Sequence, residues 1–247
     1  MMVERERLDT LLVERDLVPT RQKARALVLA GEVVVDDHRV DKPGTRVRVD
    51  AAIRLKHPLD GYVGRGAYKL LGALDAFGLD LAGVVGLDVG ASTGGFTQVM
   101  LERGATLVHA LDVGRNQLAW TLRQDERVRV YEGVNFRHFD PTVLEPQPTF
   151  ATVDVSFIGL GHILPVLGQA LPPGGVAVVL VKPQFELGRE AVGKGGIVRD
   201  AILRAQAVKQ VEQAAVQSGF AVRAQAESAI TGTDGNVEFF LHLEREG

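Results

Sequence analysis

The sequence predicts a two-domain α/β protein, in which a small α+β domain precedes a larger domain built on a mostly parallel, seven-stranded sheet. Two observations predict this fold class. Beyond residue 80, short apolar runs that are typical of strands alternate with segments whose apolar residues recur at helical spacing. Before residue 60, two helical patterns are followed by runs in which apolar and polar residues alternate. We therefore expect the first domain at residues 1–60 and the second at residues 61–247.

The composition is that of an ordinary globular protein. Of the 247 residues, 46% are hydrophobic and 24% are charged, which is enough apolar material for the cores of two domains. Cysteine is absent, which excludes a disulfide framework, a thiolate nucleophile and a cysteine metal site, and favours a cytoplasmic location. No apolar run approaches the roughly 20 residues of a membrane span, and the first residues lack an export signal, so we expect no membrane partner.

Charge and histidine placement exclude two further classes. The net charge of -3 gives no general attraction to nucleic acid, so RNA binding must rest on the placement of particular basic residues. The six histidines are scattered without the spacing of a metal site, and no metal is predicted.

The first domain begins with two helices. The first helical pattern covers residues 7–18, and the second covers residues 20–30, with Thr20 as its N-cap and Gly31 at its end. The period then changes to two, which predicts short strands. These strands lie at residues 32–35, 47–49 and 53–55.

Basic side chains gather on the second helix. Arg21 and Arg25 lie one helical turn apart, so they can meet two phosphates together. The alternative is a basic helix face that is merely solvated. Residues 57–61 combine proline and glycine without periodicity and predict a linker.

The second domain opens with a helix at residues 67–77, which Gly78 ends. Its apolar stripe faces the core, whereas Arg65 and Lys69 share the opposite face and are expected outside the core. A strand at residues 84–89 follows.

A glycine-rich turn joins that strand to the next helix. Glycine at positions 90, 94 and 95 lets the backbone approach a ligand, and the helix N-terminus offers unpaired N–H groups. The turn reads Gly-Ala-Ser-Thr-Gly-Gly and lacks the G-x-G-x-x-G spacing of dinucleotide sites. Asp88 just before it suits a cofactor that carries an amino acid group, which favours S-adenosylmethionine over NAD. A purely structural turn is the alternative.

Two residues at later strand ends extend this predicted cofactor site. Asp112 closes the strand at residues 107–112, where a carboxylate can accept hydrogen bonds from ribose hydroxyls. This pattern resembles the S-adenosylmethionine site of Rossmann-like methyltransferases, and Asn135 follows the strand at residues 128–131 at the position where such enzymes contact the adenine. An ordinary turn asparagine is the alternative. The predicted cofactor-binding residues are Asp88, Gly90, Ala91, Ser92, Thr93, Gly94, Gly95, Phe96, Asp112, Val113, Asn135 and Asp154.

The remaining elements complete the sheet. Strands are predicted at residues 150–155, 176–181, 219–222 and 237–243. Trp120 and a helix at residues 201–217 are expected to pack on the sheet.

Charged residues stand where ligands bind in such sheets, beyond the carboxyl ends of the strands. Asp154 and Lys182 end two apolar strands, and Glu238 lies in the last one. Lys69 lies on the helix before the first strand of the sheet. Charges in such places are costly unless they are paired or functional, so structural ion pairs are the alternative to a catalytic set.

The Lys-Asp-Lys-Glu order resembles the tetrad of FtsJ-type RNA ribose 2′-O-methyltransferases, and "TRQKARALVLAGEVVVDDHRV" resembles an S4 RNA-binding domain. The whole chain is similar to the TlyA family, historically called haemolysin A, through "GRGAYKLLGALDAFG", "LDVGASTGGFT", "VDVSFI", "LVKPQFELG" and "GNVEFFL". One departure is Gly64, where that family usually has serine.

The resemblance implies a Rossmann-like S-adenosylmethionine-dependent methyltransferase domain whose last two strands form an antiparallel edge. It implies an enzyme that methylates the ribose 2′-hydroxyl of a cytidine in ribosomal RNA, with the S4 domain docking the RNA. Members of that family that modify both ribosomal subunits tend to carry extra residues at the C-terminus. This chain stops at Gly247, soon after the last strand, so the resemblance implies the large ribosomal subunit as substrate. The predicted RNA-binding residues are Arg7, Arg21, Lys23, Arg25, Arg65, Arg189 and Lys194.

The resemblance also implies catalytic roles for Lys69, Asp154, Lys182 and Glu238. Lys182 would take up the proton of the hydroxyl, and Lys69 would be its electrostatic partner, because a second cation favours a neutral amine. Asp154 and Glu238 would orient these groups. Two rivals are a non-catalytic ribosome-binding factor and a membrane-active haemolysin, for which no membrane segment is legible. The oligomeric state is not predicted.

Overall fold

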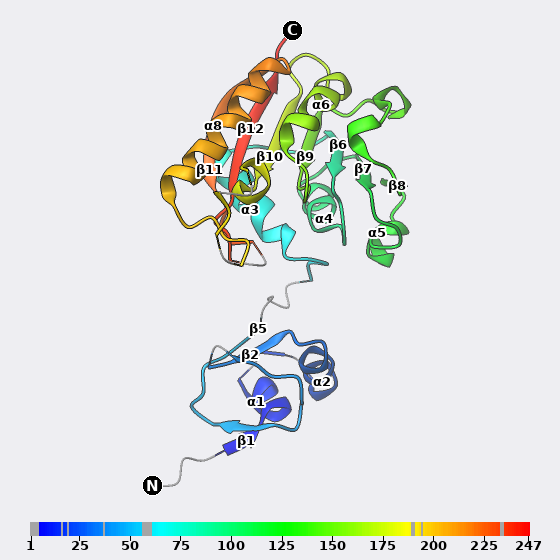
Figure 1. The fold of residues 1–247 in the computed structure, drawn as a ribbon. Coiled ribbons are helices and arrows are strands. Elements are labelled where there is room, and N and C mark those ends of the chain that lie inside the picture. The colour runs from blue at the N-terminus through cyan, green and yellow to red at the C-terminus, as the bar shows by residue number, and fades with distance from the viewer. Residues whose placement is uncertain are drawn as a thin grey trace. The chain divides into compact units, whose positions relative to one another are not determined.

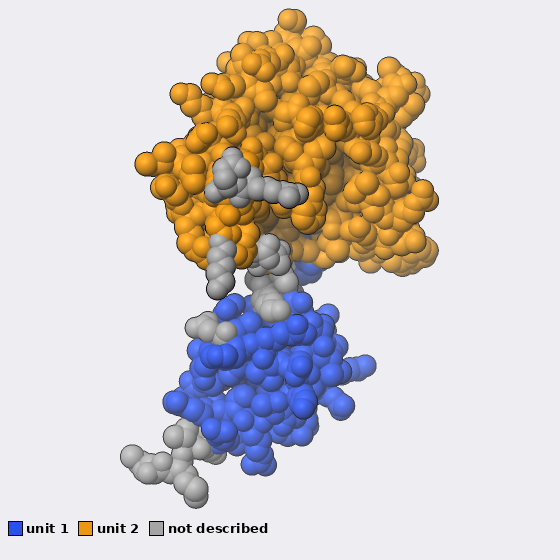
Figure 2. All heavy atoms as spheres, in the orientation of Figure 1, with its two compact units in different colours: residues 1–62 blue, residues 63–247 orange. Residues whose placement is uncertain are grey.

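The computed structural model describes residues 5–15, 17–18, 20–36, 38–55, 61–188, 191–193, 195–232 and 235–247. The chain divides into two compact units, residues 1–62 and residues 63–247, which Figure 2 colours separately. The linker predicted at residues 57–61 falls at this division, and its residues 57–60 lie outside the described residues.

The first unit contains two helices and two small sheets (Figure 1). Its elements are β1 (Arg5–Arg7), α1 (Leu8–Glu14), α2 (Arg21–Leu29), β2 (Val33–Val35), β3 (His38–Arg39), β4 (Arg46–Arg48) and β5 (Ile53–Leu55). Strand β2 pairs antiparallel with β3 and β5, and β1 pairs antiparallel with β4. Apolar residues of α1, α2 and β2 share one core, which includes Leu8, Leu12, Val28 and Val33.

The ends of these elements agree with the sequence pattern in part. The Thr20 hydroxyl accepts a hydrogen bond from the Lys23 amide at 3.2 Å, which confirms the N-cap. Helix α1 ends at Glu14, earlier than predicted. Strand β1 was missed, because the run from Arg5 to Arg7 is fully charged and shows no alternation of apolar residues.

The second unit is built on a seven-stranded sheet with the order β11-β12-β10-β9-β6-β7-β8. The strands are β6 (Val85–Val89), β7 (Leu107–Asp112), β8 (Val128–Glu132), β9 (Phe150–Val153), β10 (Val176–Val181), β11 (Phe220–Glu227) and β12 (Phe239–Arg245). Strands β6 to β10 are parallel to their neighbours among themselves. Strand β12 runs antiparallel to both β10 and β11, which confirms the expected antiparallel edge.

Helices cover both faces of this sheet (Figure 1). They are α3 (Gly66–Phe77), α4 (Gly95–Glu102), α5 (Trp120–Arg123), α6 (Leu164–Ala170), α7 (Pro183–Glu186) and α8 (Ala201–Gln217), with short 3-10 turns η1 (Phe136–His138), η2 (Pro141–Val143) and η3 (Leu160–His162).

The alternation of side chains along β6 shows which helix covers which face. Leu87 packs in one cluster with residues of α6 and α8. A Cβ added to the preceding Gly86 would instead meet the sulfur of Met100 on α4. Successive strand residues face opposite sides, so α6 and α8 cover one face and α4 covers the other.

Two details of this unit bear on the sequence reading. Gly78 adopts φ +64 and ends α3, as predicted. Trp120 was expected to pack on the sheet, but its side chain is 67% exposed on the short helix α5, so that expectation was wrong. Among the described residues, no helix is long and apolar enough to cross a lipid bilayer.

Candidate active site

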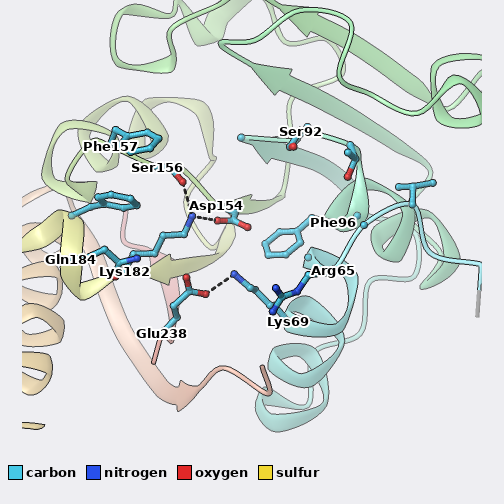
Figure 3. A pocket seen from close by; sticks show the side chains of 18 residues that line it. Arg65, Lys69, Ser92, Phe96, Asp154, Ser156, Phe157, Lys182, Gln184 and Glu238 are labelled. Atoms are coloured by element: carbon cyan, nitrogen blue, oxygen red, sulfur yellow. Dashed lines mark hydrogen bonds and ion pairs between the residues drawn. The ribbon is translucent and has the colours of Figure 1, made fainter. Parts of the chain in front are cut away.

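The four predicted catalytic residues line one cavity of about 500 Å³ (Figure 3). Asp154 follows β9, and Lys182 follows β10. Because β12 is antiparallel to β10, and Val181 pairs with Phe239, Glu238 lies beside Lys182 at the same edge of the sheet. Lys69 reaches this edge from α3.

The tetrad forms two lysine–carboxylate pairs. Lys69 Nζ lies 2.5 Å from Glu238 Oε2, and Lys182 Nζ lies 2.6 Å from Asp154 Oδ1. Lys182 also donates a hydrogen bond to the hydroxyl of Ser156 at 3.0 Å. Each buried ammonium therefore has its own counter-charge, and the two pairs face each other across the cavity in Figure 3.

Lys69 corrects one expectation from the sequence. It was expected outside the core, but it is only 8% exposed, and its partner Glu238 is 3% exposed. A paired charge can be buried where a lone one cannot, which the helical pattern of α3 does not reveal.

The glycine turn brings the backbone of β6 against the loop that follows β9. Gly90 adopts φ +88, and a Cβ at this position would overlap the backbone carbonyl oxygen of Asp154. A side chain is therefore excluded twice, by conformation and by space. Six of the predicted cofactor residues in or beside this turn line the cavity of the tetrad: Gly90, Ala91, Ser92, Thr93, Gly95 and Phe96. A Cβ at Gly94, which adopts φ +97, would instead overlap the side chains of Leu118 and Leu122.

Asp88 has a different place from the one predicted. Its carboxyl is fully buried and accepts hydrogen bonds from the hydroxyls of Thr97 at 2.7 Å and Thr152 at 3.1 Å. Burial raises the pKa of Asp88 to about 7. Asp88 lines neither of the cavities at this edge, so the structure assigns it to support of the turn and not to direct cofactor contact.

A second cavity of about 530 Å³ adjoins the first, and the two share Gly90, Ser92, Asp154, Ser156 and Phe157. Its lining includes the predicted residues Asp112, Val113 and Asn135. The Asp112 carboxylate accepts hydrogen bonds from the amides of Ser92 at 2.8 Å and Gly114 at 2.6 Å. The side-chain oxygen of Asn135 accepts a hydrogen bond from the Arg137 amide at 3.1 Å and so caps η1. Asn135 therefore stabilises this turn and also lines the cavity.

The predicted RNA-binding residues of the first unit cluster around α2. Arg21 and Arg25 line one shallow hollow on this helix, and Lys23 is exposed on it. Asp9 is fully buried, and its carboxylate accepts hydrogen bonds from Arg7 at 2.9 and 2.8 Å and from Arg21 at 3.4 Å. These contacts hold the two guanidinium groups together, a role for Asp9 that no sequence pattern signalled.

The other predicted RNA contacts lie in the second unit. Arg65 lines the tetrad cavity and donates a hydrogen bond to the Thr231 carbonyl at 2.9 Å. Arg189 and Lys194 lie outside the described residues.

The structure adds residues that the sequence reading missed. Phe157 is 91% exposed and adopts φ +64, and the centroid of its ring lies 5.1 Å from the ring centroid of Phe185. Glu186 accepts hydrogen bonds from the Leu160 amide at 3.0 and 3.2 Å, and burial raises the pKa of its carboxyl to about 7. Ser156 and Gln184 also line the tetrad cavity. The one available signal was position, because all of them follow the charged ends of β9 and β10.

Comparisons with known proteins show which family the chain resembles over nearly its whole length. The family model described as FtsJ-like methyltransferase matches residues 62–245, and the S4 domain model matches residues 6–53. The chain is 48% identical to a Bacillus subtilis protein provisionally named as an rRNA methyltransferase, over 100% of this chain and 88% of that protein. It is 44% identical to the 16S/23S rRNA (cytidine-2′-O)-methyltransferase TlyA of Mycobacterium tuberculosis, over 99% of this chain and 92% of that protein. A solved structure from Streptococcus thermophilus, provisionally described as a hemolysin, superimposes with a TM-score of 0.77 at 46% identity, over 99% of this chain and 90% of that one.

Proposed function

The chain belongs to the FtsJ-like methyltransferase family, and from this premise we propose that it methylates the 2′-hydroxyl of a cytidine ribose in ribosomal RNA. The supporting observation is the meeting of two lysine–carboxylate pairs with a glycine turn at one edge of the sheet. A factor that only binds ribosomes has no use for four charged groups around one cavity, three of them buried.

The two adjoining cavities fit S-adenosylmethionine and a nucleotide of the substrate. When it is bound, S-adenosylmethionine supplies a methyl group on a positively charged sulfur. Asp112, Val113 and Asn135 would hold the adenosine part, and the backbone from Gly90 to Thr93 would hold the amino acid part. The close approach of Gly90 to the Asp154 carbonyl supports this fit, because it keeps the space above the turn free of side chains.

The tetrad supplies the base that a ribose hydroxyl needs, since this hydroxyl is a weak nucleophile. We assign the proton acceptor to Lys182. As a neutral amine, Lys182 would take the proton of the hydroxyl, and the Asp154 carboxylate, whose Oδ1 lies 2.6 Å from Lys182 Nζ, would stabilise the ammonium that forms. Lys69 and Glu238, 2.5 Å apart, would hold the hydroxyl toward the cofactor side of the cavity.

The S4 unit would dock the RNA through its phosphates. Arg21 and Arg25 share one hollow, and Asp9 fixes Arg7 beside Arg21, so several guanidinium groups are held ready for a charged backbone. In the second unit, the exposed ring of Phe157 at the rim of both cavities suits stacking with a base. Ribosomal RNA as substrate would place the reaction in the cytoplasm.

Transfer of labelled methyl groups tests the proposal. Purified protein, labelled S-adenosylmethionine and each ribosomal subunit lacking the modification are combined, and the labelled nucleotide is mapped. We expect label on a cytidine ribose, loss of more than about a hundredfold with Lys182→Ala, and full transfer by Lys209→Ala on the exposed side of α8. We propose the large subunit as the better substrate. Binding to ribosomes without transfer to either subunit would replace the enzyme with a binding factor.

A further inference from the structure

The side chain of Gln184 carries a buried acceptor that lacks a partner. Gln184 lies in the first turn of α7, two residues after Lys182. Its Oε1 atom is shielded from solvent and accepts no hydrogen bond from any described residue. Buried polar atoms are nearly always satisfied, so an orphaned acceptor in a cavity wall points to a ligand that donates to it.

The position of Gln184 indicates which ligand this is. The cavity has two sides, and Figure 3 shows Ser92 and Phe96 on one side, with Gln184 and Phe157 on the other, beyond Asp154 and Lys182. The first side carries the glycine turn and is the cofactor side. The second side is left for the nucleotide whose ribose meets the tetrad.

The surroundings of Gln184 suit a nucleobase. The next residue along α7 is Phe185, whose ring contacts that of Phe157, so two aromatic rings lie on this side of the cavity. Flat apolar surfaces stack on bases, and side-chain amides pair with base edges. Gln184 places a neutral amide beside these two aromatic rings. It can therefore contact a base while the four charged residues of the tetrad keep their own partners.

We propose that Gln184 reads the base of the target nucleotide, with its carbonyl accepting from the exocyclic amino group of cytosine and its NH2 donating to the ring nitrogen N3. This inference rests on the proposed function. Uracil presents an oxygen and an N–H at the same two positions, so both contacts would be mismatched. Gln184 would therefore be the residue that selects cytidine over uridine.

The test compares two substrates with one variant. Ribosomal subunits carry either the mapped target cytidine or a uridine in its place, and kcat/KM of methyl transfer is measured for each. Gln184→Met keeps the length of the side chain and removes both contacts. Gln206→Met, on the exposed side of α8, is the matched control. If Gln184→Met fails to fold, Gln184→Asn keeps the amide but withdraws it by one methylene.

We expect the wild type and the control to prefer cytidine by roughly 10- to 100-fold. Gln184→Met should lose most of its rate on cytidine and keep its rate on uridine, so that the preference falls to about threefold or less, while the affinity for S-adenosylmethionine is unchanged. Gln184→Asn should give an intermediate preference.

The outcomes separate this inference from the proposed function. The role of Gln184 is overturned if the wild type methylates cytidine and uridine with equal kcat/KM. An amide that rotates freely would give this result, because it can match either base. An equal loss on both substrates with Gln184→Met overturns it too, because that loss is structural. No transfer by the wild type to either substrate overturns the proposed function itself.

Discussion

The pair of Lys69 and Glu238 makes a quantitative prediction about stability. Lys69→Met removes the ammonium and leaves the Glu238 carboxylate, which is 3% exposed, without its counter-charge. Breaking a buried pair by removal of one partner costs about 3–5 kcal/mol. Replacing both partners by neutral groups of similar size costs far less, because no charge remains in the cavity wall.

The contrast with the second pair sharpens this prediction. The side chain of Asp154 is 21% exposed, so water can hydrate its carboxylate when Lys182 is removed. We expect Lys182→Met to destabilise by only about 1–2 kcal/mol, roughly a third of the effect of Lys69→Met. The double variant Lys69→Met/Glu238→Gln should recover most of the loss of the single variant.

Urea unfolding followed by tryptophan fluorescence, with calorimetry in parallel, measures these differences. Trp120 is the only tryptophan and lies in the second unit, so its signal reports on that unit. A loss of about 3 kcal/mol lowers the melting temperature of a domain of this size by roughly 6–12 °C. The reasoning is refuted if Lys69→Met and Lys182→Met lose equal stability, or if the double variant is no more stable than Lys69→Met.

Three further predictions concern other parts of the molecule. Because burial raises the pKa of Asp88 to about 7, the native state holds a proton that the unfolded chain loses near pH 4. The free energy of unfolding should therefore fall as pH rises from about 4 to 7, relative to Asp88→Asn, and a parallel pH profile for the two proteins would contradict this. Gly90→Ala should weaken binding of S-adenosylmethionine by more than tenfold in calorimetry, whereas Gly83→Ala, also at positive φ but with open space around it, should cost only about 1–2 kcal/mol of stability and no affinity. Arg21→Ala and Arg25→Ala should each weaken RNA binding and lower the slope of log K against log salt by about 0.9 in filter binding, and an unchanged slope would exclude these phosphate contacts.

The large sheet was predictable because its strands carry the strongest sequence signal. Strands β7 and β10 have the predicted bounds, since β10 is an unbroken apolar run and β7 is apolar except for His109 and its last residue, Asp112. Glu238 was placed within the last strand, but β12 begins at Phe239. The alternation of apolar and polar residues predicts a strand here, but it does not show at which residue the pairing of β12 with β10 begins.

The site could be predicted only in part, because polar contacts depend on residues far apart in the chain. The strand-end rule identified Asp154 and Lys182, whose cavity the structure describes. It could not show that Asp88 points away from the cavity toward two threonines, since strand position does not fix a side chain's partners. It also did not single out Gln184, because its position after Lys182 does not reveal that its Oε1 atom is buried without a hydrogen-bond partner.

The insertion of β12 between β10 and β11 has a consequence for biosynthesis. Glu238 directly precedes this strand and stands 169 positions after its partner Lys69. While the chain is being made, strands β6 to β10 can pair with one another, but β11 has no neighbouring strand until β12 enters between it and β10, and Lys69 lacks the carboxylate of Glu238. The charge centre is thus assembled last, so a prematurely terminated chain would keep the S4 unit and the glycine turn but would have no complete tetrad.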